Sequence, residues 1–186
     1  NEKGEKIDLE TDSVILAVGH SAKDTVEMLY RKGIDIMQKP FSVGARIEHP
    51  REMIDRSQYG EFAGHPALGA ADYKLANHSL HHRGAYTFCM CPGGTVVPAT
   101  SDSGAVVVNG MSNYARDGEN SNSAILVGVE PEDFGSEHPL AGFKLQQEIE
   151  EKAFVAGGED YTAPAQLVGD FLQNVKSTQL GSVNPS

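Results

Sequence analysis

The chain has 186 residues, of which 39% are hydrophobic and 22% charged, and this is the composition of an average globular domain. Its 15 basic and 26 acidic residues give a formal net charge of −11, which disfavours contact with nucleic-acid phosphates and anionic lipids. We therefore expect neither a nucleic acid nor a membrane as a partner.

Export and membrane insertion are not indicated either. The longest apolar run, residues 14–18, is far shorter than the roughly 20 residues that cross a bilayer, and the first 12 residues lack the pattern of a signal peptide. The two cysteines, Cys89 and Cys91, are too close to form the framework of a secreted disulfide scaffold. These features favour a reducing cytoplasm.

The first 40 residues predict a strand, a glycine turn and a helix. Residues 14–18 have the apolar character of a buried strand, and Gly19 ends the run. Ser21 followed by Asp24 resembles a capping box, and an apolar stripe predicts a helix over residues 22–32. Such a unit is typical of parallel α/β sheets.

The middle of the chain predicts strands. Polar and apolar residues alternate over residues 41–48, so one face of this strand carries both Arg46 and Glu48. Further strands are expected at residues 85–90, 95–99, 105–109 and 124–129. No crossover helix fits between residues 85 and 109, so we expect hairpin pairing there.

The last third predicts helices and a loose tail. One helix is expected from Pro139 to the glycines at 157 and 158, and another from Pro164, with the apolar stripe of residues 167–175 facing the core. Residues 177–186 show no periodicity. The expected fold class is α+β, with a mixed, largely antiparallel sheet and flanking helices.

Two polar stretches are candidates for function. Residues 109–123 carry four asparagines and Arg116, and they form either a binding loop or a solvated loop of Asx turns. Arg46 and Arg116 are either anchors for an anionic substrate or ion-pair partners of Glu48 and Asp117.

Cys89 and Cys91 share one face of an ideal strand with Thr87. Three interpretations remain open: buried inert thiols, redox or substrate-contacting thiols, and a metal site completed by a histidine at position 78, 81 or 82. The metal site is the weakest, because the cysteine spacing is tighter than that of a zinc knuckle.

Gly19, His20 and Ser21 precede the first helix, where they form either an anion site or an ordinary cap. The sequence contains no glycine-rich phosphate-binding motif and no H-E-x-x-H motif. A self-contained dinucleotide site or a zinc hydrolase is therefore disfavoured.

Several longer stretches together resemble one family, the uncharacterised bacterial FAD-dependent (NAD(FAD)-utilising) dehydrogenases. They are residues 14–25 (VILAVGHSAKDT), 39–50 (KPFSVGARIEHP), 68–74 (LGAADYK), 86–94 (YTFCMCPGG), 109–124 (NGMSNYARDGENSNSA) and 163–172 (APAQLVGDFL). The resemblance implies a flavoprotein oxidoreductase whose Rossmann-type FAD domain is interrupted by an inserted domain.

The resemblance also implies an internal fragment, because the glycine-rich turn at the start of full-length members and their final FAD-contacting segment do not occur here. Residues 1–40 would border the FAD domain, residues 41–176 would form the inserted substrate-side domain, and residues 177–186 a loose tail. Gly19, His20 and Ser21 would contact the cofactor. The substrate-pocket candidates are Cys89, Cys91, Asn109, Met111, Arg116, Asn120 and Asn122, whereas no catalytic residue and no metal ligand is assigned.

The implied cofactor is FAD in the full-length protein, with NAD(P)H as a candidate electron donor. The implied partners are a small-molecule substrate and the remainder of the FAD domain, and the fragment alone is not expected to hold FAD tightly. A non-catalytic module that binds a protein or a small anion through the asparagine-rich loop remains as the alternative.

Overall fold

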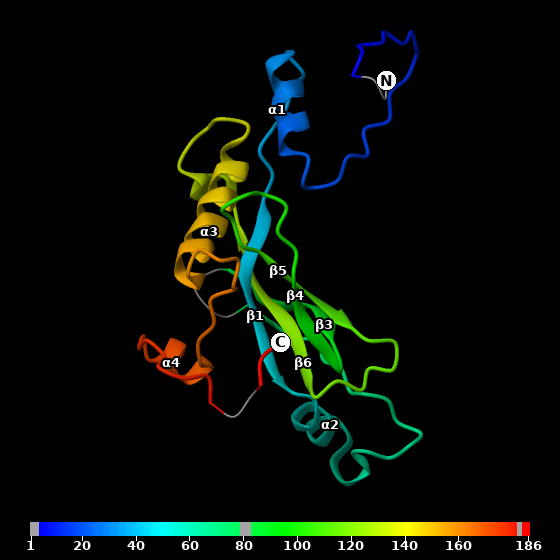
Figure 1. The fold of residues 1–186 in the computed structure, drawn as a ribbon, viewed down its shortest axis with the longest axis vertical. Coiled ribbons are helices and arrows are strands. Elements are labelled where there is room, and N and C mark those ends of the chain that lie inside the picture. The colour runs from blue at the N-terminus through cyan, green and yellow to red at the C-terminus, as the bar shows by residue number, and fades with distance from the viewer. Residues whose placement is uncertain (1–3, 79–82, 182–183) are drawn as a thin grey trace. The chain divides into compact units, whose positions relative to one another are not determined.

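The computed structural model describes residues 4–78, 83–181 and 184–186, and it divides the chain into two compact units, Asn1–Asp35 and Ile36–Ser186 (Figure 1).

The first unit contains one helix, α1 (Lys23–Arg31), which confirms the helix predicted over residues 22–32. The predicted capping box is wrong, because the N-cap is Ala22 and no side chain caps the helix. The Asp24 carboxylate instead accepts a hydrogen bond from the adjacent Thr25 amide at 2.7 Å.

The strand predicted over residues 14–18 is not formed. Val14 and Ile15 are 81% and 92% exposed, and none of the described residues pairs with this run. A strand needs a neighbour for its backbone amides and carbonyls, and this unit supplies none.

The second unit is built on a four-stranded antiparallel sheet with the strand order β1–β6–β3–β2. A separate antiparallel pair joins β4 and β5. The strands are β1 (Phe41–Pro50), β2 (Ala76–Asn77), β3 (Ala85–Cys91), β4 (Gly94–Pro98), β5 (Val108–Ser112) and β6 (Asn120–Val129). The expected α+β class with a largely antiparallel sheet is confirmed.

In chain order, two of the described helices of this unit follow β1 and three follow β6 (Figure 1). They are α2 (Arg51–Tyr59), η1 (Gly60–Phe62), η2 (Pro131–Phe134), α3 (Ala141–Gly157) and α4 (Val168–Leu172). The helix predicted from Pro139 is confirmed as α3, which ends at the left-handed Gly158.

Two details of the predicted strands are wrong. β3 pairs with β6 and β2 rather than with β4, so only β4 and β5 form the expected kind of hairpin. The strand expected at residues 105–109 begins instead at Val108. The Val106 amide, which a strand would use in its ladder, donates to the Glu150 carbonyl of α3 at 3.0 Å.

The predicted packing of the apolar stripe at residues 167–175 is also wrong. The helix there spans only Val168–Leu172, and Phe171 and Leu172 are 68% and 76% exposed. Gly169 and Asp170 give weak helix propensity, and no described element covers the stripe.

The core is small. The buried apolar residues are Ala71, Cys91, Ala105, Val106, Val129 and Ala141, and among the described residues no leucine, isoleucine, phenylalanine or methionine is fully buried. The largest fully buried side chains are polar, namely Asn122, Ser121 and Ser123. The centre of the unit is therefore a polar region of the sheet.

Candidate functional site

Strand register brings polar side chains from β1 and β6 onto one face of the sheet. Glu48 pairs with Asn122 and Pro50 with Asn120, so alternation places Arg46, Glu48, Asn120 and Asn122 on the same side. We call these four residues the polar cluster. Asn122 is 0% exposed and Asn120 is 8% exposed, so this end of β6 is enclosed.

Hydrogen bonds within the polar cluster link three strands. The Arg46 Nη1 donates to Asn122 Oδ1 and, at 3.2 Å, to the Cys89 carbonyl of β3. The Asn120 Nδ2 donates to Glu48 Oε1 at 3.0 Å and to the Asn184 carbonyl at 2.8 Å. These bonds fix β1, β3 and β6 relative to one another.

The ion pairs considered for the two arginines do not form in the described part of the chain. Arg46 uses neutral acceptors, while Glu48 accepts hydrogen bonds from Asn120 and Ser186. No ion pair joins Arg46 to Glu48 or Arg116 to Asp117 among the described residues.

β5 covers the polar cluster through Gly110. A Cβ atom at this position would overlap the Arg46 Nη1 and the Asn122 Oδ1, so a larger residue would have to displace both side chains. Asn122 Nδ2 is buried without a hydrogen-bond partner. The polar cluster is therefore closed from this side, and its hydrogen bonds join the strands.

The opposite face of the same sheet end holds a second polar group. His49 is 7% exposed, and its Nε2 lies 2.8 Å from the Tyr73 hydroxyl. Burial raises the pKa of Tyr73 above its ordinary value of 10.0, although a hydrogen bond with Ser123 and the charge of Arg46 act in the opposite direction. Tyr73 is therefore held in its neutral form.

This raised pKa predicts a loss of stability at high pH. Tyr73 is protonated in both states below pH about 10, and above it the unfolded state loses the proton first, so the free energy of unfolding falls as the pH rises. Urea unfolding between pH 9 and 11 should therefore show a shallower decline for Tyr73→Phe than for the unchanged chain. The exposed Tyr114→Phe is the control, and an equal slope in all three proteins would contradict the assignment.

The two cysteines do not share a face. The register shifts between Phe88 and Cys91, and Cys89 takes a positive φ of 46° in this bulge. Cys89 is exposed, whereas Cys91 is buried with its Sγ donating to the Cys89 carbonyl at 3.3 Å. The expectation of a shared face is wrong because the bulge breaks the two-residue alternation.

The thiols should therefore react differently. Cys89 should react with a thiol reagent in the native chain, while Cys91 should react at least tenfold more slowly because it needs local opening. Mass spectrometry of labelled peptides separates the two sites, and Cys89→Ser should remove the fast phase. Equal labelling rates would refute the burial of Cys91.

The other substrate-pocket candidates lie outside the polar cluster. Asn109 and Met111 are exposed on β5, on either side of Gly110, and the Asn109 Oδ1 accepts from the Gly110 amide at 2.9 Å. Arg116 is exposed in the turn between β5 and β6, with a φ of 52°. The structure thus brings Asn120, Asn122 and the Cys89 backbone together. Asn109, Met111 and Arg116 lie apart from them.

The asparagine-rich stretch is shorter as a loop than predicted. β5 continues to Ser112 and β6 starts at Asn120, so residues 113–119 form the connection. Sequence reasoning also missed the buried polar residues Ser121, Ser123 and His49, and the partly buried Tyr73. The signal for β6 was available, because Asn-Ser-Asn-Ser continues directly into the apolar run at residues 124–129.

The remaining candidates lie elsewhere. Gly19, His20 and Ser21 are exposed in the first unit, before α1. His81 and His82 lie outside the described residues, and the described part of the chain contains no cluster of three or more metal-ligating side chains.

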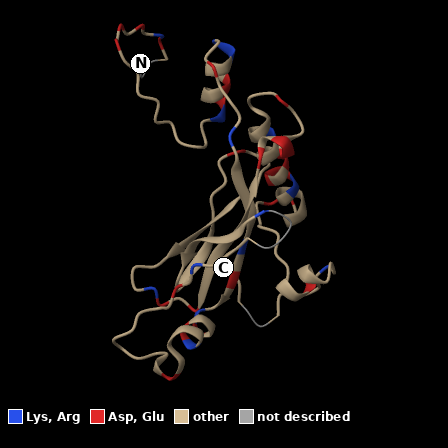
Figure 2. Ribbon diagram, turned by 180° about the vertical axis from the view of Figure 1, so that it is seen from behind, with Lys and Arg blue, Asp and Glu red and all other residues tan. Residues whose placement is uncertain are grey.

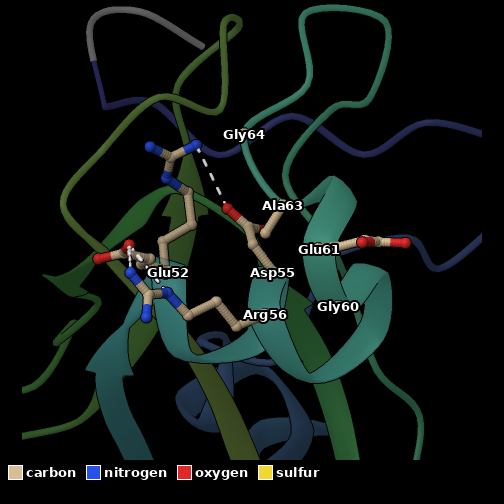
Figure 3. A pocket seen from close by; sticks show the side chains of 8 residues that line it. Glu52, Asp55, Arg56, Gly60, Glu61, Ala63 and Gly64 are labelled. Carbon is tan, nitrogen blue, oxygen red and sulfur yellow. Dashed lines mark hydrogen bonds and ion pairs between the residues drawn. The ribbon is translucent and has the colours of Figure 1, made fainter.

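A charged depression lies between α2 and η1, with a volume of about 530 Å³ (Figure 3). Arg51 lies 3.6 Å from Asp55 and Arg56 lies 2.6 Å from Glu52, and Asp55 also accepts from the Ala71 amide. Opposite charges thus largely neutralise one another in this depression.

Comparison with known proteins connects this fold to a family. Residues 40–186 match the family described as "FAD-dependent protein, C-terminal domain-like". The chain belongs to this family. It is also 52% identical over 176 residues to an uncharacterized protein of Clostridium beijerinckii (strain ATCC 51743 / NCIMB 8052), a match that covers 94% of the chain. The chain spans only about a third, 33%, of the length of that relative.

The described residues do not by themselves fit a complete FAD site. In the polar cluster, Asn122 Nδ2 is a buried nitrogen without a hydrogen-bond partner, and it is enclosed beneath Gly110. Residues 19–21 are exposed and form no enclosed binding surface.

No helix in the described ranges is long and apolar enough to cross a membrane.

Proposed function

We propose that Ile36–Ser186 is the substrate-side domain of a longer FAD-dependent oxidoreductase, covering a flavin that the rest of that protein holds. The observation that carries this proposal is the family match over residues 40–186, in a chain that spans a third of its relative. The exposed apolar run at residues 14–18 supports it, since a strand of this type needs a neighbouring strand from elsewhere.

In this proposal a bound flavin supplies the redox chemistry, and this chain supplies position and shelter. The polar cluster fixes β1, β3 and β6, while Gly110 holds β5 across them. Among the substrate-pocket candidates, the exposed Cys89, Asn109, Met111 and Arg116 are the ones available for direct contact, because Cys91, Asn120 and Asn122 are buried.

Further parts of the proposal rest on the resemblance. Gly19, His20 and Ser21 would lie beside the cofactor, residues 1–40 would border the FAD domain, and NAD(P)H would deliver electrons. The location would be cytoplasmic, which suits two free cysteines.

The test uses a chimera in which this chain replaces the matching third of the C. beijerinckii relative. We expect the purified chimera to contain FAD, identified by its absorbance spectrum and by release on denaturation. Deleting Ile36–Ser186 from the chimera should at least double the quenching of flavin fluorescence by iodide, because the flavin loses its cover.

One control and one contradicting result define the outcome. The exposed Lys144→Gln on α3 should leave the quenching unchanged. A chimera without flavin, or one whose flavin is quenched equally after the deletion, would contradict the proposed role and favour a non-catalytic binding module.

A further inference from the structure

The middle of one sheet face carries apolar side chains that are exposed. Register places Val43 beside Val127 and Ala85, and Ala45 beside Ile125 and Thr87, in two adjacent rows across β1, β6 and β3. We call these six residues the open face. Ile125 is 42% exposed and Val127 is 37% exposed, although they lie on the central strand of the sheet.

The open face lies opposite the face that β5 covers. Gly110 of β5 contacts Arg46 and Asn122, whose side chains alternate with those of Ala45 and Ser123. On the apolar side, Phe134 contacts Phe41 at one end and Tyr73 contacts His49 at the other. Between these two ends, Ile125 and Val127 remain exposed in the described part of the chain. Figure 2 shows the strands largely free of charged residues, whereas acidic residues gather on α3.

In a self-contained antiparallel sheet, the apolar face packs on the core and the polar face meets water. Here the polar cluster is covered, whereas the open face is exposed. The described residues include no fully buried leucine, isoleucine, phenylalanine or methionine. The apolar layer that η2 and α3 place against Phe41 therefore does not extend over Ile125 and Val127. Contact surfaces of proteins are commonly found at exposed apolar patches.

We propose that the open face packs against the part of the longer protein that lies outside this chain. The 52% identical relative carries about twice as much chain outside the match as within it, which is enough to supply an apolar layer. The absence of charged residues from the open face suits a permanent apolar contact rather than a transient polar one. This inference rests on the proposed membership of a longer flavoprotein and adds which surface makes the contact.

Thiol labelling tests the contact directly. We expect the engineered thiol of Ile125→Cys to react rapidly in the 186-residue chain and at least tenfold more slowly in the chimera. The matched control is Val155→Cys on α3, where the native side chain is 62% exposed. Labelling is read from the separate peptides, so Cys89 and Cys91 do not interfere.

The ratio of the two rates decides the outcome. Slowing at position 125 relative to position 155 supports the proposal, and equal slowing or no slowing at both positions overturns it. A dimer of the isolated chain that Ile125→Lys dissociates, while Val155→Lys does not, would also overturn it in favour of a second copy.

A second arm does not depend on the chimera folding. The chain is co-expressed with the unmatched two-thirds of the relative and recovered through an affinity tag on that partner. Ile125→Lys should lower the recovered amount at least tenfold, and Val155→Lys less than twofold; equal recovery overturns the proposal.

Flavin content separates this inference from the proposed function. Protection of position 125 in a chimera without flavin would support the contact and contradict the flavoprotein role. A flavin-containing chimera with position 125 fully reactive would support the flavoprotein role and contradict the contact.

Discussion

Replacing Gly93 with alanine should lower the free energy of unfolding of the Ile36–Ser186 unit by about 3 kcal/mol. Gly93 connects β3 to β4 with a φ of 52°, and an added Cβ would overlap the carbonyl of Arg116. This obstacle is backbone, and it cannot move without disturbing the bond from the Gly118 amide to the Gly93 carbonyl at 3.2 Å. The Gly93 amide also donates to Ser121 Oγ at 3.0 Å, so the strain would reach the buried end of β6.

The matched control for this change is Gly104→Ala. Gly104 also has a positive φ, 73°, but an added Cβ would meet nothing within 4 Å. Denaturant unfolding should show a loss of about 1 kcal/mol at Gly104, from the backbone conformation alone. Equal losses at both positions would show that the close approach to Arg116 does not contribute.

Replacing Asn122 with alanine should cost about 2 to 4 kcal/mol, for two reasons. The side chain is 0% exposed, so truncation leaves a cavity, and Arg46 loses the Oδ1 acceptor that orients its guanidinium. The loss of the unpartnered Nδ2 offsets part of this cost.

Two comparisons make this second prediction specific. The exposed Asn109→Ala, on β5, should change the free energy of unfolding by less than about 0.5 kcal/mol. Arg46→Met should lose much of its own effect when Asn122 is already alanine, because both changes remove the same contact. Additive effects of the two substitutions would contradict the coupling within the polar cluster.

The parts of the fold with a strong local pattern could be predicted from sequence. The alternation over residues 41–48 gives β1, and Gly158 in a left-handed conformation ends α3 where its glycine pair predicts. The apolar run at residues 14–18 has an equally strong pattern, but a strand forms only where another strand pairs with it.

The candidate site was harder to predict, because it depends on pairing across long sequence separations. Arg46 meets Asn122 and Cys89 through two strand registers, and neither contact is visible in a local window. The bulge at Cys89 separates two thiols that ideal alternation places together. Burial of Asn120 and Asn122 could not be inferred, since asparagine more often occupies exposed turns.

In the proposed function, this chain covers a flavin whose binding site lies mainly in the rest of a longer protein. The flavin content per polypeptide, measured by absorbance after purification in the presence of FAD, tests it most directly. We expect close to one FAD per chimera and almost none on the 186-residue chain, since micromolar binding requires about 8 kcal/mol and the described residues show no built cradle. A chimera without flavin, or a 186-residue chain that retains FAD through gel filtration, would contradict this role.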